Sequence, residues 1–574
     1  MQKKWRLMPE ISQDFINDNP DYSRVILQLL FNRGFTKKAD IESLLKATYD
    51  TDANDPFLFN DMEKATEIVI GHIKAGNKIF IYGDYDADGV TSSSLLYDFL
   101  LMLKADVSVY IPDRVKEGYG VNKQAIDFIS GEKAKLVITV DSGIRSKEEV
   151  AYAFSQGIEV IITDHHMPPE NREDWPNCLI INPSMPTENY PYKFLAGVGV
   201  AFKLATAILS KAKLNDEMKM MIEKRMLDLV AVGTVADCVP LLGENRILVR
   251  EGLKSLQDSR RIGLKELLKA SKIDDKKVSS WNIGFQIAPR INAAGRMDHA
   301  NTAFDLMITK DEGRALELAT ELNDRNIQRQ EATVAIFNQV DDQVKDSKDK
   351  ILIGIFDLDK EKQSEIWNEG VIGLVAGRIC EKYYKPTLVI TKVEDGYKGS
   401  GRSIEEFNLI EAIAGVSELL EKFGGHPMAC GLSLSDKKID EFKQTMIANT
   451  NEFLKDVELA PSIKIEADLK ITEINETLIS DIARFEPFGQ GNDRPKFSTM
   501  QAVIIDKMFM GSDNQHVKFK LKQQDSNVIN ALGFGQSKKW EDLNPGQIID
   551  LVYNINLNEF NGRTEIQMII VDIK

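Results

Sequence analysis

Three aspartates lie within five residues of one another in the stretch 83–91, which reads GDYDADGVT and follows the apolar run 79–82. At the end of a strand, Asp84, Asp86 and Asp88 would repel one another unless cations neutralised them, and their oxygens are ligands that Mg²⁺ and Mn²⁺ prefer. A calcium-binding loop or a solvated turn is the alternative. A calcium loop of the EF-hand type requires a glutamate at its end and a helix on either side, so the pattern favours a magnesium or manganese site.

Two further strands of this region are expected to end in metal-binding side chains. Asp141 follows the apolar run 136–140, and the run 158–163 leads into residues 164–166, an aspartate and two histidines. Sites of open α/β sheets assemble at the carboxyl edge of the strands. Taken singly, Asp141 could cap a helix and the histidines could be ordinary loop residues, but three such strand ends together predict one site. A later acid, Asp237, precedes a proline-terminated turn and by itself would be a turn residue.

The elements that must position these residues belong to an α/β sheet. From about residue 78 to 183, short β-branched runs alternate with helical stretches, and a helix is predicted at 91–103 after a turn at Gly89. Mostly apolar strands separated by helices indicate a parallel sheet that is covered on both faces. The residues before position 60 are mainly helical in pattern and carry no evident chemistry.

A long helix and a second α/β unit are predicted further along the chain. The stretch 311–344 has helical spacing and many charges over an unusually long span, which suits a helix that connects two domains. Strands are then expected at 351–356 and 387–390, and helices near 371–384 and 405–421.

From about residue 462 the pattern becomes mainly β. Apolar residues alternate with three lysines in 517–522, and a similar alternation runs through 551–557. The tail is therefore predicted to be a small β-barrel. A strand with alternating lysines is often only a solvated face, so a purely structural role for the tail stays open.

Length and composition limit the functional classes. A chain of 574 residues exceeds the size of a single core and predicts three or four domains. Its net charge of −16 argues against coating of nucleic acid by bulk attraction, so binding would need a local basic groove. Four widely spaced cysteines are predicted to be buried thiols of a reducing compartment. The short apolar runs and the absence of an apolar leader predict a cytoplasmic protein without a membrane partner.

In this order, the acids and histidines resemble the DHH phosphoesterases, a family named for the motif at residues 164–166. The resemblance implies a centre with two ions, Mn²⁺ or Mg²⁺, whose ligands would be Asp86 on one ion, Asp88, His165 and Asp237 on the other, and Asp141 between them. His166 would face the substrate phosphate as the catalytic side chain. Related members carry a histidine where Tyr82 stands, and Asp84 is expected to supply the missing ligand.

The metals would determine the mechanism. Two neighbouring cations can lower the pKa of a bridging water, orient it in line with phosphorus and stabilise the leaving oxygen. No protein nucleophile is then required. The sequence contains no arrangement of serine, histidine and aspartate that competes with this interpretation.

A substrate-binding pattern stands in the second α/β unit. Residues 398–403 (KGSGRS) and 423–426 (FGGH) resemble the DHHA1 domain that accompanies DHH domains. In that domain glycines let backbone amides approach phosphate and an arginine supplies a two-pronged donor. The resemblance implies that Ser400, Arg402 and His426 bind the substrate phosphate, whereas each short glycine motif alone is more often a plain turn.

Three more segments resemble the branch of the family that degrades single-stranded DNA from the 5′ end: residues 112–120, 290–296 and 486–492. Arg114, Arg290 and Arg296 are expected to contact DNA, although each could be a simple surface residue. The β-rich tail resembles the OB-fold of the same branch, and OB-folds bind single strands through basic grooves and stacking.

The expected fold is α/β: a parallel-sheet DHH domain, a second α/β DHHA1 domain joined by a long helix, and a C-terminal OB-fold β-barrel. The expected divisions are a helical lead segment (1–60), the DHH domain (61–310), the connecting helix (311–345), the DHHA1 domain (346–456) and the OB-fold (457–574).

The resemblance implies a 5′ to 3′ exonuclease that hydrolyses single-stranded DNA to 5′-mononucleotides in DNA repair and recombination. Single-stranded DNA would be the main partner, with a single-strand-binding protein and a helicase as further partners. A phosphodiesterase for short oligonucleotides or cyclic dinucleotides is the first alternative, and it would not need the OB-fold. A single-strand-binding protein that has lost catalysis is the second, and the full set of candidate ligands argues against it.

Overall fold

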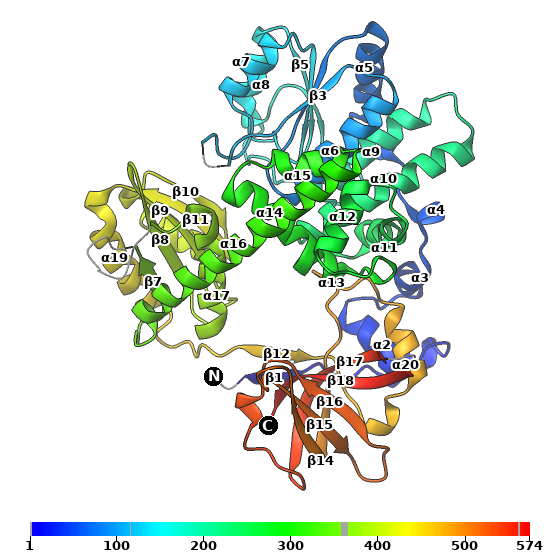
Figure 1. Ribbon diagram of the computed structural model, residues 1–574, viewed down its shortest axis with the longest axis vertical. Coiled ribbons are helices and arrows are strands. Elements are labelled where there is room, and N and C mark those ends of the chain that lie inside the picture. Colours follow the sequence, from blue (N-terminus) through cyan, green and yellow to red (C-terminus); the bar gives the residue numbers. More distant parts are fainter. Residues whose placement is uncertain (1–2, 115, 357–365, 561–562) are drawn as a thin grey trace.

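The computed structural model describes residues 3–114, 116–356, 366–560 and 563–574. Figure 1 shows a first α/β unit at the top, a second at the left and a β-barrel at the bottom. The helix α16 (Glu312–Val344) runs from the first α/β unit to the second. Each unit has a hydrophobic core of its own, as the chain length predicts. Within the described ranges, no helix is both long enough and apolar enough to cross a bilayer.

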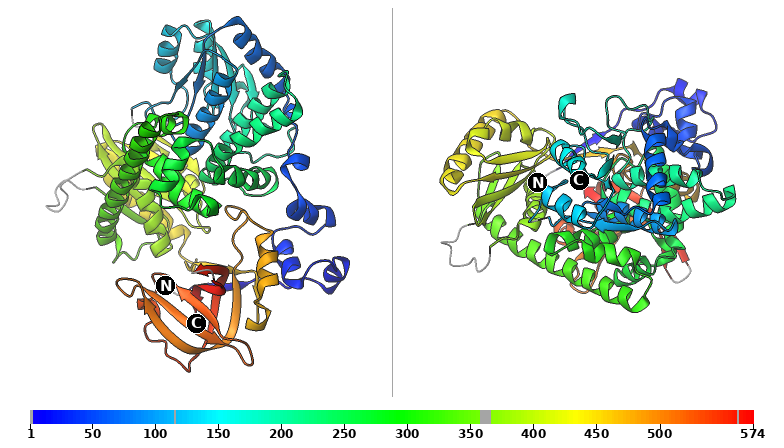
Figure 2. Two further views of the ribbon diagram at one scale, coloured as in Figure 1. Left: turned by 45° about the vertical axis from the view of Figure 1, so that its right-hand side comes forward. Right: turned by 90° about the horizontal axis from the view of Figure 1, so that it is seen from above.

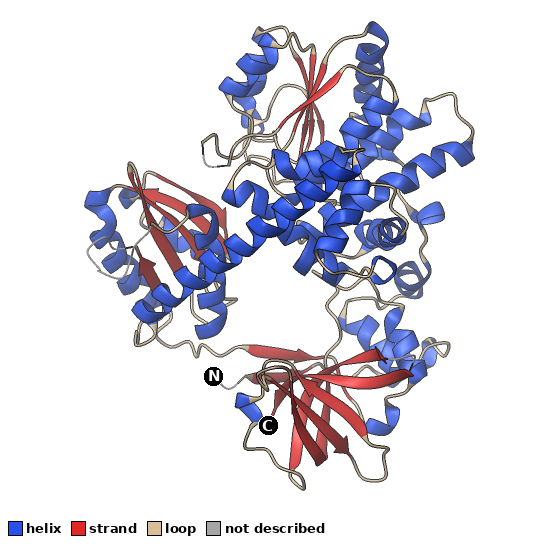
Figure 3. Ribbon diagram, in the orientation of Figure 1, coloured by secondary structure: helices blue, strands red, loops and turns tan. Residues whose placement is uncertain are grey.

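The first unit is built on a parallel sheet in the order β3-β2-β4-β5-β6. Helices cover both of its faces, as Figure 3 shows, which explains the almost uninterrupted apolar strands. The strands are β2 (Ile79–Tyr82), β3 (Val107–Tyr110), β4 (Leu136–Val140), β5 (Glu159–Thr163) and β6 (Leu179–Ile181). The covering helices are α5 (Met62–Ala75), α6 (Ala87–Met102) and α9 (Gly197–Ser210) on one face, and α7 (Lys123–Gly131) and α8 (Lys147–Ser155) on the other. The predicted parallel sheet is confirmed.

The helix after the first strand begins earlier than the sequence predicts. α6 starts at Ala87 because the side chain of Asp86 accepts the backbone amides of Asp88 (2.9 Å) and Gly89 (3.0 Å) and so caps the helix. Gly89 lies inside the helix and is not the turn predicted for it. A Cβ at this position would lie 2.5 Å from the carbonyl oxygen of Asp84, so the glycine allows the helix to approach the preceding loop.

A helical half completes the first unit and leads into α16. Its helices are α10 (Asp216–Ala236), α11 (Gly243–Gln257), α12 (Ile262–Ala270), α13 (Ser280–Asn282), the π-helix η4 (Ile283–Ile287), α14 (Ala288–Met297) and α15 (Asn301–Ile308). Of the cysteines, Cys380 and Cys430 are buried, as predicted, and Cys178 is partly buried. The prediction is wrong for Cys238, which is exposed because it lies in the turn after α10, with φ of 58°.

The second unit has a mixed sheet in the order β10-β11-β9-β8-β7, in which only β7 and β8 run parallel. Its strands are β7 (Leu352–Ile355), β8 (Thr387–Val393), β9 (Gly396–Arg402), β10 (Lys422–His426) and β11 (Ala429–Leu434), and its helices are α17 (Glu369–Tyr383), α18 (Leu409–Ala414) and α19 (Ile439–Phe453). The helix predicted at 405–421 is wrong in extent. Only α18 and a short 3₁₀ turn at Ser417–Leu419 form there, before β10 begins.

Both glycine motifs of this unit lie in strands and not in turns. The glycines of β9 have a packing role: a Cβ on Gly399 would lie 2.8 Å from a methyl of Leu432, and one on Gly401 would lie 2.6 Å from a methyl of Leu409. The amides of both residues belong to the sheet. The expectation that these amides approach a phosphate is therefore wrong for Gly399 and Gly401.

The tail forms a closed barrel, as predicted, because β14 pairs with both β15 and β17. Val517, Phe519 and Leu521 fill its core, and the lysines between them face outward. The barrel strands are β14 (Phe497–Met510), β15 (His516–Lys522), β16 (Ile529–Gly533), β17 (Ile548–Phe560) and β18 (Arg563–Ile573), accompanied by β12 (Ser462–Ile465), β13 (Ala467–Asp468) and α20 (Glu476–Ala483).

The lead segment belongs to the barrel in space. Its helices are α1 (Gln13–Asp18), α2 (Arg24–Asn32), α3 (Lys38–Lys46) and α4 (Tyr49–Asp52). A strand that was not predicted, β1 (Lys4–Leu7), pairs in parallel with β12. The apolar residues of α2 and α3 share a core with α20 and the barrel strands, and Arg33 forms a buried ion pair with Glu466 at 3.3 Å. Figure 2 shows this segment, in dark blue, running from the first unit down to the barrel.

Candidate metal centre and substrate-binding residues

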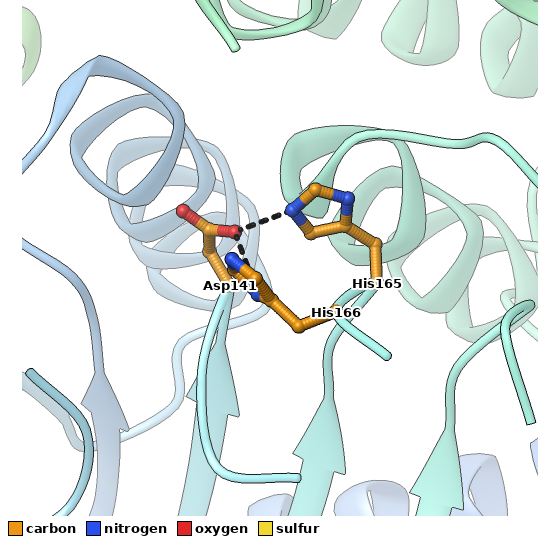
Figure 4. Close-up of side chains that lie close together, drawn as sticks. All are labelled: Asp141, His165 and His166. Atoms are coloured by element: carbon orange, nitrogen blue, oxygen red, sulfur yellow. Dashed lines mark ion pairs between the residues drawn. The ribbon is translucent and has the colours of Figure 1, made fainter. Parts of the chain in front are cut away.

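The predicted ligands meet at the carboxyl edge of the first sheet. Figure 4 shows Asp141, after β4, pointing at the imidazoles of His165 and His166, which follow β5. The Nε2 atom of His165 lies 3.1 Å from Oδ1 of Asp141, and Nδ1 of His166 lies 3.9 Å from the same oxygen. α10 presents Asp237 at its C-terminal end, 3.6 Å from His165 Nε2. A carboxylate at that end of a helix opposes the helix dipole and calls for a cation.

The acids and His165 form two neighbouring groups. Asp84, Asp86 and Asp141 make one, and Asp88, His165 and Asp237 make the other, with ligand atoms in each group within 4.8 Å of one another. Asp141 also groups with His165 and His166. Its carboxylate therefore lies between two sets of oxygen and nitrogen donors, each of a kind that suits a divalent cation.

Four buried polar atoms of this cluster have no hydrogen-bond partner among the residues that the structure describes: Asp84 Oδ1, Asp141 Oδ1, His165 Nε2 and Asp237 Oδ2. The Oδ1 atom of Asp141 lies 3.1 Å from His165 Nε2 without the orientation of a hydrogen bond, and Oδ2 of Asp237, at 3.6 Å, is too far away for one. Buried polar atoms without partners cost free energy, and native proteins rarely keep them. Bound cations would satisfy all four atoms, so the residues present fit a metal centre.

The electrostatics of the cluster also indicate that bound cations are needed. Burial, reinforced by the neighbouring carboxylates, raises the pKa of Asp84 and Asp141 well above the ordinary value. The same causes raise the pKa of Asp88 to about 7 and that of Asp237 to about 9. Burial and the charge of His166 lower the pKa of His165 to about 4, so this imidazole is neutral and able to bind a metal.

Asp164 holds His166 in place, a role that the sequence did not assign. Its buried carboxylate accepts the backbone amides of Ile144 (3.0 Å), His165 (2.7 Å) and His166 (3.0 Å), and it lies 2.8 Å from His166 Nδ1. Burial lowers the pKa of His166, but the hydrogen bond to Asp164 and the charges of the surrounding carboxylates together outweigh it and raise the pKa above the ordinary value. Tyr119 Oη adds a contact of 3.1 Å to the same Nδ1. The side chain of His166 is 41% exposed, so its Nε2 atom is free to bind a ligand.

Two glycines that the sequence did not single out let helices approach the cluster. Asp88 accepts the amides of Gly197 (2.7 Å) and Val198 (2.8 Å) at the N-terminus of α9. A Cβ on Gly197 would lie 2.6 Å from that of Asp141, and one on Gly233 of α10 would lie 2.8 Å from a carboxylate oxygen of Asp88. Any larger residue at either position would displace a candidate ligand.

Tyr82 points away from the cluster. Its hydroxyl donates to the carbonyl of Gly120 at 2.9 Å, and its ring stacks on Tyr110 at 5.5 Å on the other face of the sheet. The buried carboxylate of Asp84 is within the cluster instead, in agreement with the replacement that the sequence suggested.

The phosphate-binding candidates of the second unit share one face of its sheet. Ser400 and Arg402 are two residues apart on β9, and Arg402 is in register with His426 through Ala429 of the strand between them. Arg402 Nη1 donates to Ser400 Oγ (3.2 Å) and to the carbonyl of Gly401 (2.7 Å). His426 is exposed at the end of β10, and its Nδ1 accepts the amide of Met428 at 3.2 Å.

Arg296 joins the two α/β units beside the acids. Its Nη1 donates to the carbonyl of Gly370 at 2.8 Å. Burial, followed by the charges of Arg114 and other arginines that include Arg402, lowers its pKa to about 10, and Asp86 acts in the opposite direction. Arg114 itself lies over the ring of Tyr85, 4.9 Å from the centroid. Arg114, Arg296 and Arg402 are therefore neighbours at the edge of the acid cluster.

Arg290 lies apart from that group. Its Nε donates to Asn323 Oδ1 at 3.2 Å, and its Nη1 donates to the carbonyl of Gln286 at 2.7 Å. The structure thus brings together all the predicted metal ligands, and it places Arg290 in a different cluster of cations that involves α16.

A crowded set of carboxylates and imidazoles at the C-terminal edge of a parallel sheet, beside basic residues of a second α/β unit, defines a metal-dependent phosphoesterase of the DHH class. The DHH family N-terminal domain matches residues 78–234, the DHHA1 domain matches 348–452, and the RecJ OB domain matches 465–572. The chain belongs to the RecJ family.

Two relatives and one solved protein describe the extent of the similarity. The single-stranded-DNA-specific exonuclease RecJ of Bacillus subtilis is 37% identical over 96% of this chain and 67% of its own length. The enzyme of the same name from Salmonella typhimurium is 31% identical over 96% of both chains. The crystal structure of RecJ in complex with Mn²⁺ from Thermus thermophilus has a TM-score of 0.83 and 27% identity, and it covers all of this chain and 79% of its own. The same protein in complex with Mg²⁺ gives a TM-score of 0.77 and 26% identity, over all of this chain and 78% of its own.

Proposed function

We propose that the protein is a metal-dependent exonuclease that degrades single-stranded DNA from its 5′ end and releases 5′-mononucleotides. The observation that carries the proposal is the buried, unsatisfied cluster around Asp141, which lies beside the arginines at the junction of the two α/β units. The relatives named as single-stranded-DNA-specific exonucleases support this choice of substrate.

The candidate ligands would hold two ions, Mn²⁺ or Mg²⁺: Asp84 and Asp86 on one, Asp88, His165 and Asp237 on the other, and Asp141 on both. Bound in this way, divalent cations supply the acidity that activates a water and the charge that stabilises the leaving oxygen. His166, fixed at Nδ1 by Asp164, would donate from Nε2 to an oxygen of the scissile phosphate. It is the catalytic residue of the proposal because it would touch the reacting group.

The direction of degradation follows from the basic residues. Ser400 and Arg402, with Arg114 and Arg296 nearby, would bind the 5′-terminal phosphate and so present the adjacent linkage to the metal centre. His426 is on the same face of the sheet and would contact the same nucleotide. The strand would therefore be shortened from its 5′ end.

A cavity of about 1260 Å³ between the helical half and the barrel supports a single-stranded substrate. Trp281 and Phe285, which are 58% and 69% exposed, stack on each other at 5.4 Å on its wall, and Phe488 and Phe534 line it as well. Unpaired bases stack on exposed aromatic rings regardless of sequence. The remainder of the strand would run along this wall towards the OB-fold.

The cellular part of the proposal follows from the substrate. An enzyme that consumes single-stranded DNA from an end would serve DNA repair and recombination in the cytoplasm. A helicase that unwinds duplex DNA and a protein that coats single strands would be its partners.

End-labelled strands test the proposal. With a 5′ label the enzyme should release labelled mononucleotide at the earliest times, and with a 3′ label it should first give long labelled remnants. Arg402→Ala should reduce the advantage of a 5′-phosphate by about tenfold or more, because it removes a charge-assisted hydrogen bond. Arg314→Ala, an exposed arginine already paired with Glu317, is the control and should change nothing.

Early release of mononucleotide from the 3′ label would overturn the proposed direction. A strong preference for dinucleotides over long strands would favour the phosphodiesterase alternative.

A further inference from the structure

A second cluster of arginines lies on three helices that pack against one another, α14, α16 and α17. Arg290 is on α14, Arg329 is on α16 and Arg378 is on α17. Burial and then the charges of Arg378 and Arg290 lower the pKa of Arg329. Arg329 on the central helix α16 therefore lies near both Arg290 and Arg378.

No carboxylate compensates these charges among the residues that the structure describes. The buried Nε of Arg329 has no hydrogen-bond partner there, and Arg290 donates only to a side-chain amide and a backbone carbonyl. Arg325, one turn earlier on α16, also has a buried nitrogen without a partner, Nη1, but its charge is paired: its Nη2 lies 2.7 Å from Asp298 and 2.5 Å from Glu321. Carboxylates from α16 and from the end of α14 thus pair with Arg325, and none pairs with Arg329 among the described residues.

The partly buried guanidinium of Arg329 costs stability unless an anion binds to it, and Arg290 is partly buried as well, whereas Arg378 is exposed at the rim. Partly buried charges are retained in proteins when they are paired, and an unpaired one carries a desolvation penalty that nothing offsets. Guanidinium groups match the oxygens of phosphate with two parallel hydrogen bonds. The chemistry that fits an unpaired Arg329 flanked by Arg290 and Arg378 is a phosphate oxyanion.

The cluster adjoins the substrate-binding residues. The charge of Arg329 acts on Arg296, which also senses Arg114, Arg402 and Asp86. Arg296 therefore lies between the two sets of arginines, so an anion on the second set would neighbour the one on the first. A single strand offers phosphates in this repeating arrangement.

We propose that Arg290, Arg329 and Arg378 form an anion subsite that binds one backbone phosphate of the single strand, separate from the scissile phosphate and from the 5′-terminal phosphate at Arg402. The identity of the ligand as DNA rests on the proposed function. The existence of the anion subsite does not.

A strand with a single neutral linkage tests the subsite. Methylphosphonate would replace each internucleotide linkage in turn along a 5′-phosphorylated oligonucleotide, and binding would be measured in an Asp141→Asn background, which leaves the strand intact. At one position beyond the scissile linkage, the neutral methylphosphonate should weaken binding of the strand by about tenfold to a hundredfold. Arg329→Gln should weaken binding of the unmodified strand by a similar factor and should lose the sensitivity to that position, and Arg378→Gln should do the same.

Arg325→Gln is the matched control, because this arginine lies on the same helix and is already ion-paired. It should keep the sensitivity at that position. If Arg329→Gln keeps it as well, or if no internal position beyond the scissile linkage is sensitive, the subsite is overturned.

Thermal stability separates a binding role from a structural one. Removing an uncompensated charge should raise the Tm of Arg329→Gln and leave the hydrolysis of a 5′-phosphorylated dinucleotide unchanged. A lower Tm together with loss of dinucleotide hydrolysis would mean that Arg329 only supports the fold, and this would overturn the proposal.

Sodium sulfate distinguishes failure of the subsite from failure of the proposed function. At matched ionic strength, sulfate should raise the Tm of the wild-type protein above that in sodium chloride, and Arg329→Gln should lose this difference. That result would support the anion subsite even if DNA proved not to be the substrate. Equal sulfate effects in both proteins would contradict it.

Discussion

Asp141 is unusual in its backbone as well as in its side chain. It has φ of 57°, in the left-handed region, which aspartate and asparagine tolerate better than most other residues. Its carboxylate contacts the imidazole of His165 and lies against Gly197. Strained conformations of this kind persist where the surroundings fix them, and they cluster at functional sites. Replacement by asparagine keeps the backbone preference and removes only the charge, which alanine does not.

Asp141→Asn should lower the rate of hydrolysis by at least about a hundredfold while the protein stays folded. Even groups that only orient metal ligands contribute about tenfold to a hundredfold, and Asp141 is proposed to bind both ions itself. Steady-state hydrolysis of a labelled strand and circular dichroism would measure the two effects. Asp106→Asn, at the opposite edge of the same sheet, is the control, and near-normal turnover by Asp141→Asn would contradict the two-metal assignment.

Removal of the metals should make stability depend on pH. In the metal-free protein the pKa values of Asp88 and Asp237 are raised to about 7 and about 9, whereas an unfolded aspartate has a pKa of about 3.9. The folded state then binds these protons more tightly, so the stabilisation is complete below pH ~4 and is lost as the pH rises through 7 and 9. With a chelator, Tm should fall between pH 5.5 and 8.5, and the rise in Tm on adding Mn²⁺ should grow over the same window.

The same titration of Tm on Asp141→Asn would show a smaller dependence on pH, because one of the interacting carboxylates is gone. A difference between chelator and Mn²⁺ that stays constant with pH would show that these carboxylates do not carry the effect.

At the scale of elements, the sequence predicted those features that depend on local periodicity. The strand ends that carry Asp84, Asp141 and His165 follow mostly apolar runs, and the alternation in β15 marks a barrel strand. The length of α16 follows from its helical spacing. Position within an element was harder, because α6 begins at a cap formed by Asp86, a residue that also has the appearance of a loop ligand.

Features that depend on distant contacts could not be predicted from local pattern. The glycines of β9 leave room for the side chains of Leu432 and Leu409 to pack against the strand. In sequence, such glycines look the same as those of a phosphate-binding turn. The pairing of β1 with β12 has no local signal, since each strand is short and the two lie far apart in the sequence. The role of Arg329 could not be predicted from the sequence. Helical spacing indicates that α16 is a helix, but it does not indicate which of the many charged residues of α16 lack a partner.

At the scale of the whole molecule, the two ends of the chain build one domain. The lead helices α2 and α3 share a core with the barrel, and α4 contacts α11 of the first unit. Further hydrogen bonds join the first unit to the region before the barrel, such as Ser280 Oγ to the carbonyl of Phe488 at 2.6 Å and the amide of Leu241 to the carbonyl of Gln490 at 2.8 Å. The barrel is thus attached at several points, and its removal affects the lead segment too.

A truncation that ends at Pro461 should keep hydrolysis of short substrates and bind long strands at least about tenfold more weakly, because each lost base stack is worth about 1–3 kcal/mol. The structure adds that this protein would expose the apolar side of α2, such as Leu27 and Leu30. A second variant, residues 48–461, removes both partners and should be the more soluble of the two. Unchanged affinity and salt dependence for long DNA would rule out strand binding by the barrel.

The shared core of the lead helices and the barrel has a consequence for synthesis on the ribosome. The lead segment emerges first and the barrel last, and at about 5–20 residues per second the interval between them is roughly 20 to 80 s. Throughout that time the apolar side chains of α2 have only their partners within the lead segment, such as Ile41 and Leu44, and lack those of the barrel. This apolar surface therefore stays exposed to aggregation until residues 465–572 have been made. A product truncated before the barrel would keep the apolar side of α2 exposed, a defect that chaperones and proteases can recognise.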